Sequence, residues 1–488
     1  MTLATATLSD GRTVDFIPEA IGDGAMKVVY FTPDRKSVVC LYKDAASGSD
    51  PLRLQRLEKV LGRYNPTVTR GRGGAAQTET EADYFRTLYC WPTAIVVKPG
   101  LGIMTPTYPA NFFFETGPDF IKGKEKNGMR FLGRKNRALL EKLAAAELGT
   151  WINYFKLCIR MARAVMRLHN AGLAHSDLSP NNVLVDPSRG LSIIIDIDSL
   201  VVEGLFPPDV AGTKGYIAPE VLSTLHLPTK DPQRRHPNAR TDQHALAVLI
   251  YQYLLRRHPL DGRKIPPAQT AEEQELLSYG SQALFCEHPT DQSNRPEEKT
   301  YIGCSDLGPA LHDLFQQAFV EGLHDPKRRP TAAQWLRGLI KTWDLLVPCS
   351  NVRCPSQWYV LHDPTRPQCP FCNARPAQPL PVLKFRTERR PGHWMPDGQL
   401  VVYDNLHLFK WHAFDNLFPG PEVDHTPQAR CSFDQGKWLL VNQQLESLTS
   451  PGGNRVPPGS AVELKDGAQI RLSQEPHARI ADVQIVKA

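Results

Sequence analysis

Short apolar runs separated by turn residues mark the first part of the chain. In the segments VDFIPEAIGDGAMKVVYF (14–31) and KSVVCLYKD (36–44), strand-forming residues are interrupted by Gly, Pro and Asp. From Trp151 to Leu168 the apolar residues recur at helical spacing instead. The pattern therefore predicts a β-rich N-terminal part that is followed by a helical part.

The later half of the chain carries three more helical patterns and then changes in character. The apolar spacing predicts helices at 242–257, 308–320 and 331–346. Four cysteines then fall between 349 and 372, and the Pro-rich segment 374–392 is typical of an extended linker. Beyond it, six short runs bounded by turn residues predict a small all-β domain: GQLVVYD, LHLFKWH, ARCSFD, GKWLLVN, AVELKDG and AQIRLS.

Length and charge limit the class of protein. A chain of 488 residues is too long for one core and is expected to form several domains. Its 57 Lys and Arg against 51 Asp and Glu give a net charge of +6, which is too mild to indicate nucleic acid as a partner. No apolar run is long enough to span a membrane, and the first residues lack the apolar core of a signal peptide. We therefore expect a cytoplasmic protein without membrane or nucleic-acid partners.

One stretch departs from the even spread of charge. Residues 121–137, IKGKEKNGMRFLGRKNR, carry seven basic side chains against the single Glu125. We expect a solvated, mobile insertion here, with a docking patch for an acidic or phosphorylated partner as the alternative.

The first candidate site residues suit the binding of nucleotide phosphates. The turn GDGAMKVV (22–29) places Gly22 and Gly24 between two strands, where missing Cβ atoms let backbone amides approach a phosphate. Lys43 follows on the next strand, where a cation can hold the phosphates.

The second group suits phosphoryl transfer itself. In HSDLSPNNVLVD (175–186), the carboxylate of Asp177 is followed by Asn182, and an apolar run then ends at Asp196. A carboxylate after a buried strand is costly to desolvate unless it binds a metal ion or several donors. These residues therefore indicate an orienting carboxylate and ligands for a metal ion.

In this order, the residues resemble the motifs of eukaryotic-type Ser/Thr protein kinases over about residues 15–345. The resemblance rests on Gly22, Gly24 and Val29 for the Gly-rich loop, Lys43 for the β3 lysine, HSDLSPNN for HRDLxxxxN, DID (196–198) for DFG and GTKGYIAPE (212–220) for the end of the activation segment. Two later segments add Asp242, expected to hold the catalytic-loop backbone, and Arg329, expected to pair with Glu220.

The resemblance implies a role for each matched residue. Asp177 is expected to orient or deprotonate the substrate hydroxyl, while Asn182 and Asp196 are expected to bind Mg²⁺ or Mn²⁺. Lys43 is expected to bind the ATP phosphates. Met104, in the segment AIVVKPGLGIMTPTY (94–108), is expected near the adenine-binding hinge.

The acidic partner of Lys43 is less defined by the motifs. We choose Glu58, because it lies in the first helical segment after the strand. Glu79 and Glu81 are the alternatives, and a surface pair on one helix would explain any of the three without a role in catalysis.

The chain departs from the family pattern at four positions. Ser176 replaces the Arg of HRD, which argues against switching by activation-loop phosphorylation, and Ser179 replaces a Lys over the γ-phosphate. Lys27 stands at the third Gly of the loop, and we hypothesise that it supplies the missing charge, with a solvent-exposed side chain as the alternative. Asp198 replaces the DFG Gly and is expected to cap the next turn, with an added contact to the metal ion as the alternative.

The cysteine cluster indicates a metal site. Cys349, Cys354, Cys369 and Cys372 form two closely spaced pairs that bracket a segment of hairpin length, which suits tetrahedral Zn²⁺. CPFC resembles the second knuckle of a zinc ribbon, and His362 is the reserve ligand. Four thiolates imply a structural site.

The last domain resembles a forkhead-associated (FHA) module in its late strands. At the place of the phosphothreonine-binding SRxHA motif it has HTPQA (425–429), so we expect an FHA-like β-sandwich that docks a partner, with an unrelated sandwich as the alternative. The domain order resembles bacterial kinases of the TerY-P type, which implies a von Willebrand A-type protein and a metal-dependent phosphatase as partners.

These observations predict an α+β, bilobal protein-kinase-like fold followed by a zinc ribbon and an all-β domain. We expect a Ser/Thr kinase that uses Mg-ATP on protein substrates, including itself, in a bacterial signalling or stress module. A nucleotide-binding pseudokinase scaffold is the alternative; small-molecule kinases lack the segment that carries Glu220 and its partner Arg329. The expected domains are a kinase N-lobe (1–108), a C-lobe (109–345), a zinc ribbon (346–375), a linker (376–392) and an FHA-like domain (393–488).

Overall fold

The computed structural model describes residues 2–24, 26–43, 51–68, 79–132, 137–197, 200–203, 205–206, 212–297 and 302–487. The chain divides into two compact units. The first unit comprises residues 1–149, 156–299 and 315–335, and the second comprises 150–155, 300–314 and 336–488.

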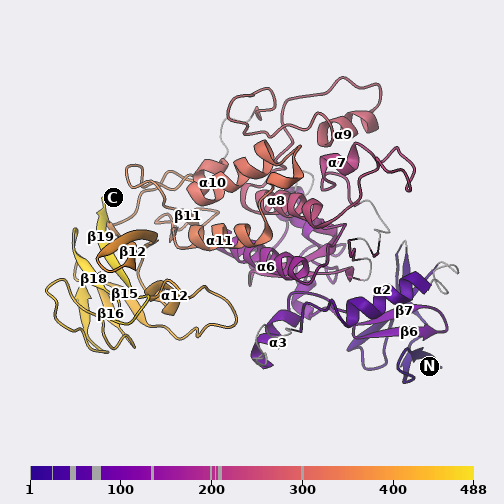
Figure 1. Cartoon of the computed structure of the whole chain (residues 1–488), viewed down its shortest axis with the longest axis horizontal. Coiled ribbons are helices and arrows are strands. Elements are labelled where there is room, and N and C mark those ends of the chain that lie inside the picture. The colour runs from indigo at the N-terminus through magenta and orange to yellow at the C-terminus, as the bar shows by residue number, and fades with distance from the viewer. Residues whose placement is uncertain are drawn as a thin grey trace. The chain divides into compact units, whose positions relative to one another are not determined.

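A seven-stranded antiparallel sheet forms the N-terminal part of the first unit, as the short apolar runs predict (Figure 1). Its strand order is β2-β1-β6-β7-β5-β4-β3. The strands are β1 (Ala4–Leu8), β2 (Thr13–Phe16), β3 (Ala20–Asp23), β4 (Lys27–Phe31), β5 (Ser37–Tyr42), β6 (Ala94–Lys98) and β7 (Gly102–Pro106).

The two faces of this sheet are buried by different side chains. Alternation along a strand places successive residues on opposite faces. One face packs Val39 and Leu41 with Ala6, Leu8 and Val96. The other packs Val29 and Cys40 against Leu57 of helix α2 (Pro51–Leu61), with Ile95 and Ile103 beside them.

Helices form most of the regular structure in the rest of the first unit and also occur in the second. They are α3 (Glu79–Arg86), α4 (Arg137–Leu140), α5 (Ala145–Leu148), α6 (Trp151–Asn170), α7 (Pro219–Leu222), α8 (Ala239–Leu255), α9 (Ala271–Tyr279), α10 (Pro309–Gln316) and α11 (Ala332–Trp343). The predicted helices at 151–168, 242–257 and 331–346 are confirmed within a few residues. The pattern at 308–320 is α-helical only to Gln316, after which Gln317–Glu321 forms a π-helical turn.

Helix α8 is the core of the helical part. Its side chains are buried almost all round, which is the pattern of a helix enclosed by protein. A capping box fixes its start, because Asn238 accepts from the Arg240 N–H while its own N–H donates to Thr241. Arg256 ends the helix in the left-handed conformation with φ of 59°.

The basic stretch 121–137 is not a solvated insertion, which corrects our expectation. Ile121, Phe131 and Leu132 are core residues, and residues 133–136 lie outside the described part of the chain. Lys126 is 4% exposed, and its Nζ lies 2.6 Å from Glu147 Oε2. Burial alone would raise the pKa of Glu147. The hydrogen bonds from Lys126 and Thr116 lower this pKa by more, so the net shift is downward. The apolar residues between the charges anchor this segment.

The second unit contains a hairpin and two further sheets. Strands β10 (Leu346–Pro348) and β11 (Trp358–Val360) form the hairpin. One four-stranded sheet has the order β13-β12-β19-β18, and the other has the order β14-β15-β16-β17. Their bounds are β12 (Leu380–Arg390), β13 (His393–Val401), β14 (His407–Leu408), β15 (Ala429–Asp434), β16 (Lys437–Asn442), β17 (Ala461–Glu463), β18 (Gln469–Arg471) and β19 (Arg479–Val486), with helix α12 (Lys410–Ala413) after β14.

The expected linker proves to be part of this β domain. Residues 380–390 form β12, the longest strand, which pairs along its length with both β13 and β19. Leu383 and Phe385 of β12 are buried, Pro379 precedes the strand, and Pro381 lies within it opposite Ile485. Trp438 of β16 donates to the Pro379 carbonyl over 2.8 Å and so ties the two sheets together.

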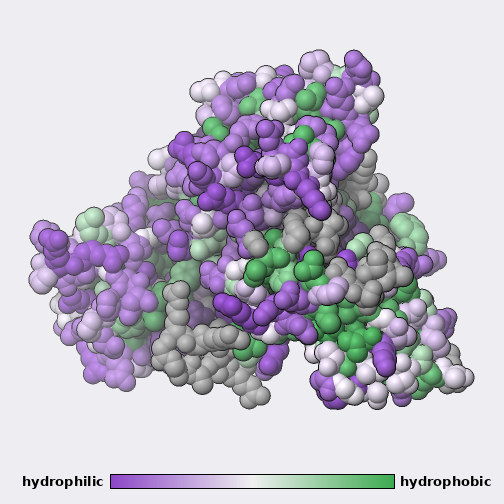
Figure 2. Space-filling model, turned by 45° about the vertical axis from the view of Figure 1, so that its right-hand side comes forward, coloured by the Kyte–Doolittle hydropathy of each residue, from purple (hydrophilic) through white to green (hydrophobic). Residues whose placement is uncertain are grey.

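Hydrophilic residues cover most of the face shown in Figure 2, and hydrophobic residues gather in a few patches. Such a mixture is normal for a protein surface. Among the described helices, none is both long and apolar enough to cross a lipid bilayer.

The buried Lys126–Glu147 pair yields a stability test. Lys126→Met should lower the free energy of unfolding by about 3–5 kcal/mol, because it leaves the Glu147 carboxylate buried without its cation. Calorimetric unfolding of the full chain measures the change. The matched control is Lys124→Met, at an exposed lysine two residues away, which should change stability by less than about 0.5 kcal/mol. Equal effects of the two substitutions would contradict this account.

Candidate active site

A buried carboxylate on α8 fixes the loop that carries the candidate catalytic residues. Asp242 is 1% exposed, and it accepts the backbone N–H of His175 over 2.7 Å and that of Ser176 over 3.2 Å. His169 Nε2 of α6 lies 3.1 Å from the same carboxylate. The expected role of Asp242 is confirmed: it holds the loop between α6 and strand β8 (Val183–Asp186).

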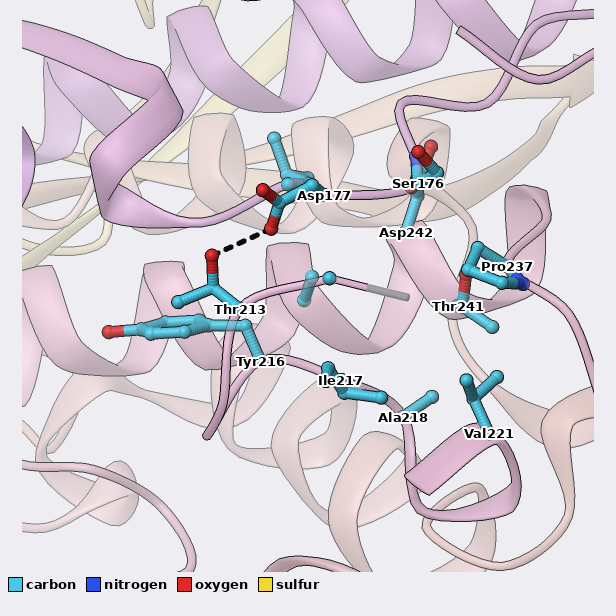
Figure 3. Close-up of a pocket in the computed structure, with 13 residues that line it drawn as sticks. Ser176, Asp177, Thr213, Tyr216, Ile217, Ala218, Val221, Pro237, Thr241 and Asp242 are labelled. Atoms are coloured by element: carbon cyan, nitrogen blue, oxygen red, sulfur yellow. Dashed lines mark hydrogen bonds between the residues drawn. The ribbon is translucent and has the colours of Figure 1, made fainter. Parts of the chain in front are cut away.

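Two polar side chains bond to the Asp177 carboxylate, and a third lies beside one of them. Asn182 donates its Nδ2 to the Asp177 carbonyl over 2.8 Å and to Asp177 Oδ2 over 3.0 Å. Thr213 donates its hydroxyl to the other carboxylate oxygen, Oδ1, over 2.7 Å, and the two side chains point toward each other in Figure 3. The Thr213 hydroxyl also lies 3.1 Å from Ser179 Oγ. Sequence reasoning did not single out Thr213, although it lies in the matched segment GTKGYIAPE.

Asp196 lies close to the loop in the chain fold and meets a cation from the N-terminal sheet. It follows strand β9 (Leu191–Ile194), which pairs with β8, and its backbone has a φ of 59°. Lys27 Nζ of β4 lies 2.8 Å from Asp196 Oδ1. The Lys27 side chain is 19% exposed and that of Asp196 is 44% exposed, so solvent screens the pair only in part.

Lys43 is placed differently from Lys27. It lies one residue beyond β5, its backbone N–H donates to the Met26 carbonyl, and its Nζ pairs with Asp23. The side chains of Lys43 and Asp23 are 37% and 70% exposed. The structure thus brings Lys27, not Lys43, into contact with Asp196.

The ion pair expected between Lys43 and Glu58 is not formed among the described residues. Helix α2 buries Arg56, Leu57 and Val60, and this orientation leaves Glu58 exposed on the helix surface. The side chain of Glu79, an alternative to Glu58, lies outside the described residues. Asp198, which was expected to cap the turn after Asp196, also lies outside them. The helix was correctly expected, but its rotation about its own axis was not readable from the sequence.

The register of β4, β5 and β7 identifies which residues share a face with Lys27. Val29 lies opposite Cys40, and Cys40 lies opposite Ile103. By the alternation of strands, Lys27, Val29 and Cys40 share one face. On β5, the position beside Val29 on this face is therefore occupied by the uncharged Cys40 and not by a cation.

The same register moves the expected hinge residue to the other face. Met104 lies opposite Val39 and packs with Ala6 and Leu8. Thr105, which is 8% exposed, lies opposite Val38 on the face that carries Val29. The prediction for Met104 had the right strand and the wrong face, because a shift of one residue reverses the side chain.

A buried arginine fixes the segment that follows Thr213. Arg329 is 4% exposed and pairs with Glu220 through two bonds, Nη1–Oε1 at 2.8 Å and Nη2–Oε2 at 2.7 Å. Its other donors reach the carbonyls of Gly322, Leu323 and Arg240. The expected pairing of Arg329 with Glu220 is confirmed, and its bidentate form is the geometry that arginine favours with a carboxylate.

A pocket adjoins Asp177 and Thr213 (Figure 3). Its walls come from the catalytic loop, from the segment 212–221 and from the start of α8. Ser176 lines it, and its Oγ is buried without a hydrogen-bond partner in the described part of the chain. The short side chain of Ser176 replaces an arginine in the motif that the loop resembles, and the pocket includes the space beside it.

The four candidate zinc ligands come together in the second unit. All four Sγ atoms lie within 4.8 Å of one another, with Cys349 3.5 Å from Cys372 and Cys354 3.9 Å from Cys369. Sulfurs at about 2.3 Å from a central Zn²⁺ would lie about 3.8 Å apart, so the donor set fits a tetrahedral ion. His362 is not part of this group as the structure describes it.

In the β domain, polar groups of the HTPQA segment bond to nearby residues of the same domain. His425 Nε2 bonds the Gly420 carbonyl at 2.8 Å, and Thr426 donates to Asp424 over 2.6 Å. The Lys410 ammonium lies 3.0 Å from the same carboxylate. The hydrogen bonds from Thr426 and from Lys410 hold the pKa of Asp424 well below its usual range. These contacts explain the local loop and give no independent support for phosphopeptide binding.

Comparison with known proteins adds a family match to this geometry. Residues 137–338 match the protein kinase domain family. The anti-Muellerian hormone type-2 receptor of Rattus norvegicus is 29% identical over 208 residues, which cover 37% of this chain and 36% of the receptor. The serine/threonine-protein kinase PknD of Chlamydia abortus is 27% identical over 179 residues, 30% of this chain and 18% of that kinase.

A solved structure also matches. The kinase domain of a Toxoplasma gondii rhoptry antigen aligns with a TM-score of 0.40 and 13% identity, over 70% of this chain and 86% of that one. The chain spans only about a third or less of the length of the two curated relatives. Asp177, Asn182, Asp196 and Thr213 lie within the segment that matches the protein kinase domain family.

Proposed function

We propose that the protein is a Ser/Thr protein kinase that transfers the γ-phosphoryl group of Mg-ATP to hydroxyls of protein substrates. The observation that carries the proposal is the hydrogen bond from the Thr213 hydroxyl to Asp177 inside the segment that matches the protein kinase domain. This bond supports the proposal because it places a Thr hydroxyl within hydrogen-bond distance of the carboxylate that would accept the proton of a substrate hydroxyl.

Asp177 accepts the hydrogen bond of the substrate hydroxyl and orients its oxygen toward the γ-phosphorus. The new P–O bond forms as the bond to the β-phosphate oxygen breaks, and the hydroxyl proton passes toward Asp177. Asn182 fixes the Asp177 carboxylate from the other side through its Nδ2. Because this reaction needs positioning more than covalent help, a held carboxylate is the main contribution of the loop.

Asn182 and Asp196 are the residues that would hold Mg²⁺. Asn182 uses its Nδ2 toward Asp177, so its Oδ1 is left as an oxygen donor, and Asp196 is a partly exposed carboxylate. This set of hard oxygen donors fits Mg²⁺ or Mn²⁺. When bound, the ion neutralises charge on the phosphates.

Lys27 is the cation that we assign to the nucleotide phosphates. It contacts Asp196, shares the sheet face with Val29 and is less exposed than Lys43. Lys43 is instead paired with the exposed Asp23 and stabilises the turn that joins β3 and β4. Gly22 lies near the end of β3, opposite Val29, and Gly24 lies in the turn, where its N–H donates to the Lys27 carbonyl over 3.0 Å.

Four thiolates of the second unit hold a structural Zn²⁺ in this proposal. Cys354 and Cys369 are 2% and 0% exposed, and no open coordination position is needed for the role. The metal would fix the hairpin β10–β11, beside which Phe371 contacts Trp151 edge-on with ring centroids 5.0 Å apart. The zinc-binding hairpin and the FHA-like β domain are proposed as modules that recruit partners. A von Willebrand A-type protein and a metal-dependent phosphatase, as in TerY-P-type systems, remain proposed partners on the resemblance alone.

Loss of the catalytic carboxylate provides the first test. Asp177→Asn should lower phosphoryl transfer from Mg-ATP to casein, and to the protein itself, by about 10²–10⁴-fold, because an amide cannot accept the proton. Radiolabel incorporation followed by phosphoamino-acid analysis measures the rate and the residue type. Binding of Mg-ATP should persist, and Asp231→Asn, at a surface turn, is the control. Nucleotide binding by a wild-type protein that transfers no phosphate would favour the pseudokinase scaffold.

The choice between the two lysines gives the second test. Lys27→Met should weaken Mg-ATP binding and lower the transfer rate, each by about tenfold or more, because a charge-assisted contact to phosphate is lost. Lys43→Met, the matched control, should change both by less than about threefold, because an exposed pair contributes little. Titration calorimetry and initial rates separate the two effects. A larger loss in Lys43→Met than in Lys27→Met would reverse the assignment.

Metal content gives the third test. The purified chain should carry one Zn²⁺ by elemental analysis, since four thiolates complete one tetrahedral site. Cys369→Ser should abolish this content and lower the unfolding temperature of the second unit. Cys431→Ser changes an equally buried cysteine of the same unit outside the cluster, and should keep the metal. Retention of zinc in Cys369→Ser would disprove the site.

A further inference from the structure

We infer that His258 is a positioning residue that holds the segment 213–217 in the place where it presents protein substrate to Asp177. The inference rests on the proposed kinase function and goes beyond it, since it names the residue that sets the geometry of substrate docking. Neither the kinase motifs nor the candidate site residues include His258.

Two hydrogen bonds fix the His258 ring. Its Nε2 lies 2.8 Å from the Gly215 carbonyl oxygen, and its Nδ1 lies 3.2 Å from the Leu260 backbone nitrogen. A carbonyl can only accept and an amide N–H can only donate, so the ring carries its proton on Nε2. The imidazole is therefore neutral and links the chain after α8 to the segment that contains Thr213.

Two tyrosines enclose the ring edge-on. Its centroid lies 6.0 Å from that of Tyr216 and 5.1 Å from that of Tyr279, the last residue of α9. Tyr216 donates its hydroxyl to Gln252 of α8 over 2.7 Å, and Tyr279 donates to Asp261 over 2.6 Å. Burial lowers the pKa of His258, although the Asp261 carboxylate, 3.7 Å from Nδ1, opposes the shift. The ring is thus held from three elements with few alternative rotamers.

Gly215, whose carbonyl contacts His258, lies two residues after Thr213, whose hydroxyl bonds to the Asp177 carboxylate. Gly215 has a φ of +82°, and the Thr213 carbonyl accepts from the N–H groups of Tyr216 and Ile217 in the same turn. Thr213 then donates its hydroxyl to Asp177. Because the turn is closed by short-range bonds, release of the Gly215 carbonyl would let the whole turn shift relative to Asp177.

A matched pair of variants separates the positioning bond from simple packing. The amide nitrogen of Gln can occupy the place of Nε2 and donate to Gly215, whereas Asn reaches only the place of Nδ1. Steady-state kinetics of the full chain with Mg-ATP and casein are measured for wild type, His258→Asn and His258→Gln. Amide hydrogen exchange at Tyr216 and Ile217 is measured on the same proteins, with the amides of α8 as the internal reference.

We expect His258→Asn to raise the KM for casein by about tenfold, as for one buried hydrogen bond lost, and to leave the KM for Mg-ATP within about twofold. Exchange at Tyr216 and Ile217 should accelerate by a similar factor without a change in α8. His258→Gln should restore both readouts to within about threefold of wild type.

Three results would overturn the inference. They are equal behaviour of the Asn and Gln variants, an equal rise in the KM for Mg-ATP, and unchanged exchange at Tyr216 and Ile217 in His258→Asn. If the wild type transfers no phosphate, the proposed function fails by itself. The exchange comparison then still decides whether His258 holds the turn.

Discussion

The Asp242 carboxylate is the contact on which the site depends. A carboxylate that is 1% exposed would be strongly unfavourable without donors, and three donors meet it, two of them backbone N–H groups of the catalytic loop. The loop therefore cannot move without leaving a buried charge unpaired. This constraint places the loop that carries Asp177 and Asn182 at the N-terminal end of α8. The position of α8 is itself fixed by burial on nearly all sides. The site inherits its rigidity from the core of the helical part.

A second buried charge pair extends this rigidity to the substrate side. Arg329 and Glu220 form a bidentate pair, and the remaining donors of Arg329 are used on backbone carbonyls. Between this pair and Asp177 lies the segment 212–218, which is held by Thr213 at one end and by the contact of Gly215 with His258. Fixed bonds at several points replace the charged contact that the motif arginine would have supplied at Ser176.

The charges near the proposed nucleotide site are exposed or half-exposed, so each pair contributes less to stability than a buried pair does. Lys27 reaches Asp196 from β4, while Cys40 occupies the neighbouring strand without a charge. Lys27 pairs with Asp196 at the proposed site, whereas the more exposed Lys43 pairs with Asp23 at the surface. In the second unit the thiol cluster plays a comparable fixing role for a short hairpin, since β10 and β11 alone are too short to be stable.

The sequence by itself determined the elements and much of the chemistry. Strand and helix periodicity identified the N-terminal sheet, α6, α8 and α11, and motif order singled out Asp177, Asn182 and Asp196 as candidates and Asp242 as the residue that holds their loop. It misplaced whatever depends on facing and on long-range pairing. Only the tertiary structure decided that Glu58 turns outward, that Met104 lies on the far face, that Lys126 is buried and that residues 380–390 pair as a strand. The physical reason is that a shift of one residue moves a side chain to the opposite face of a strand, or turns it by about 100° around a helix, at little local cost, so that the packing partners select the face.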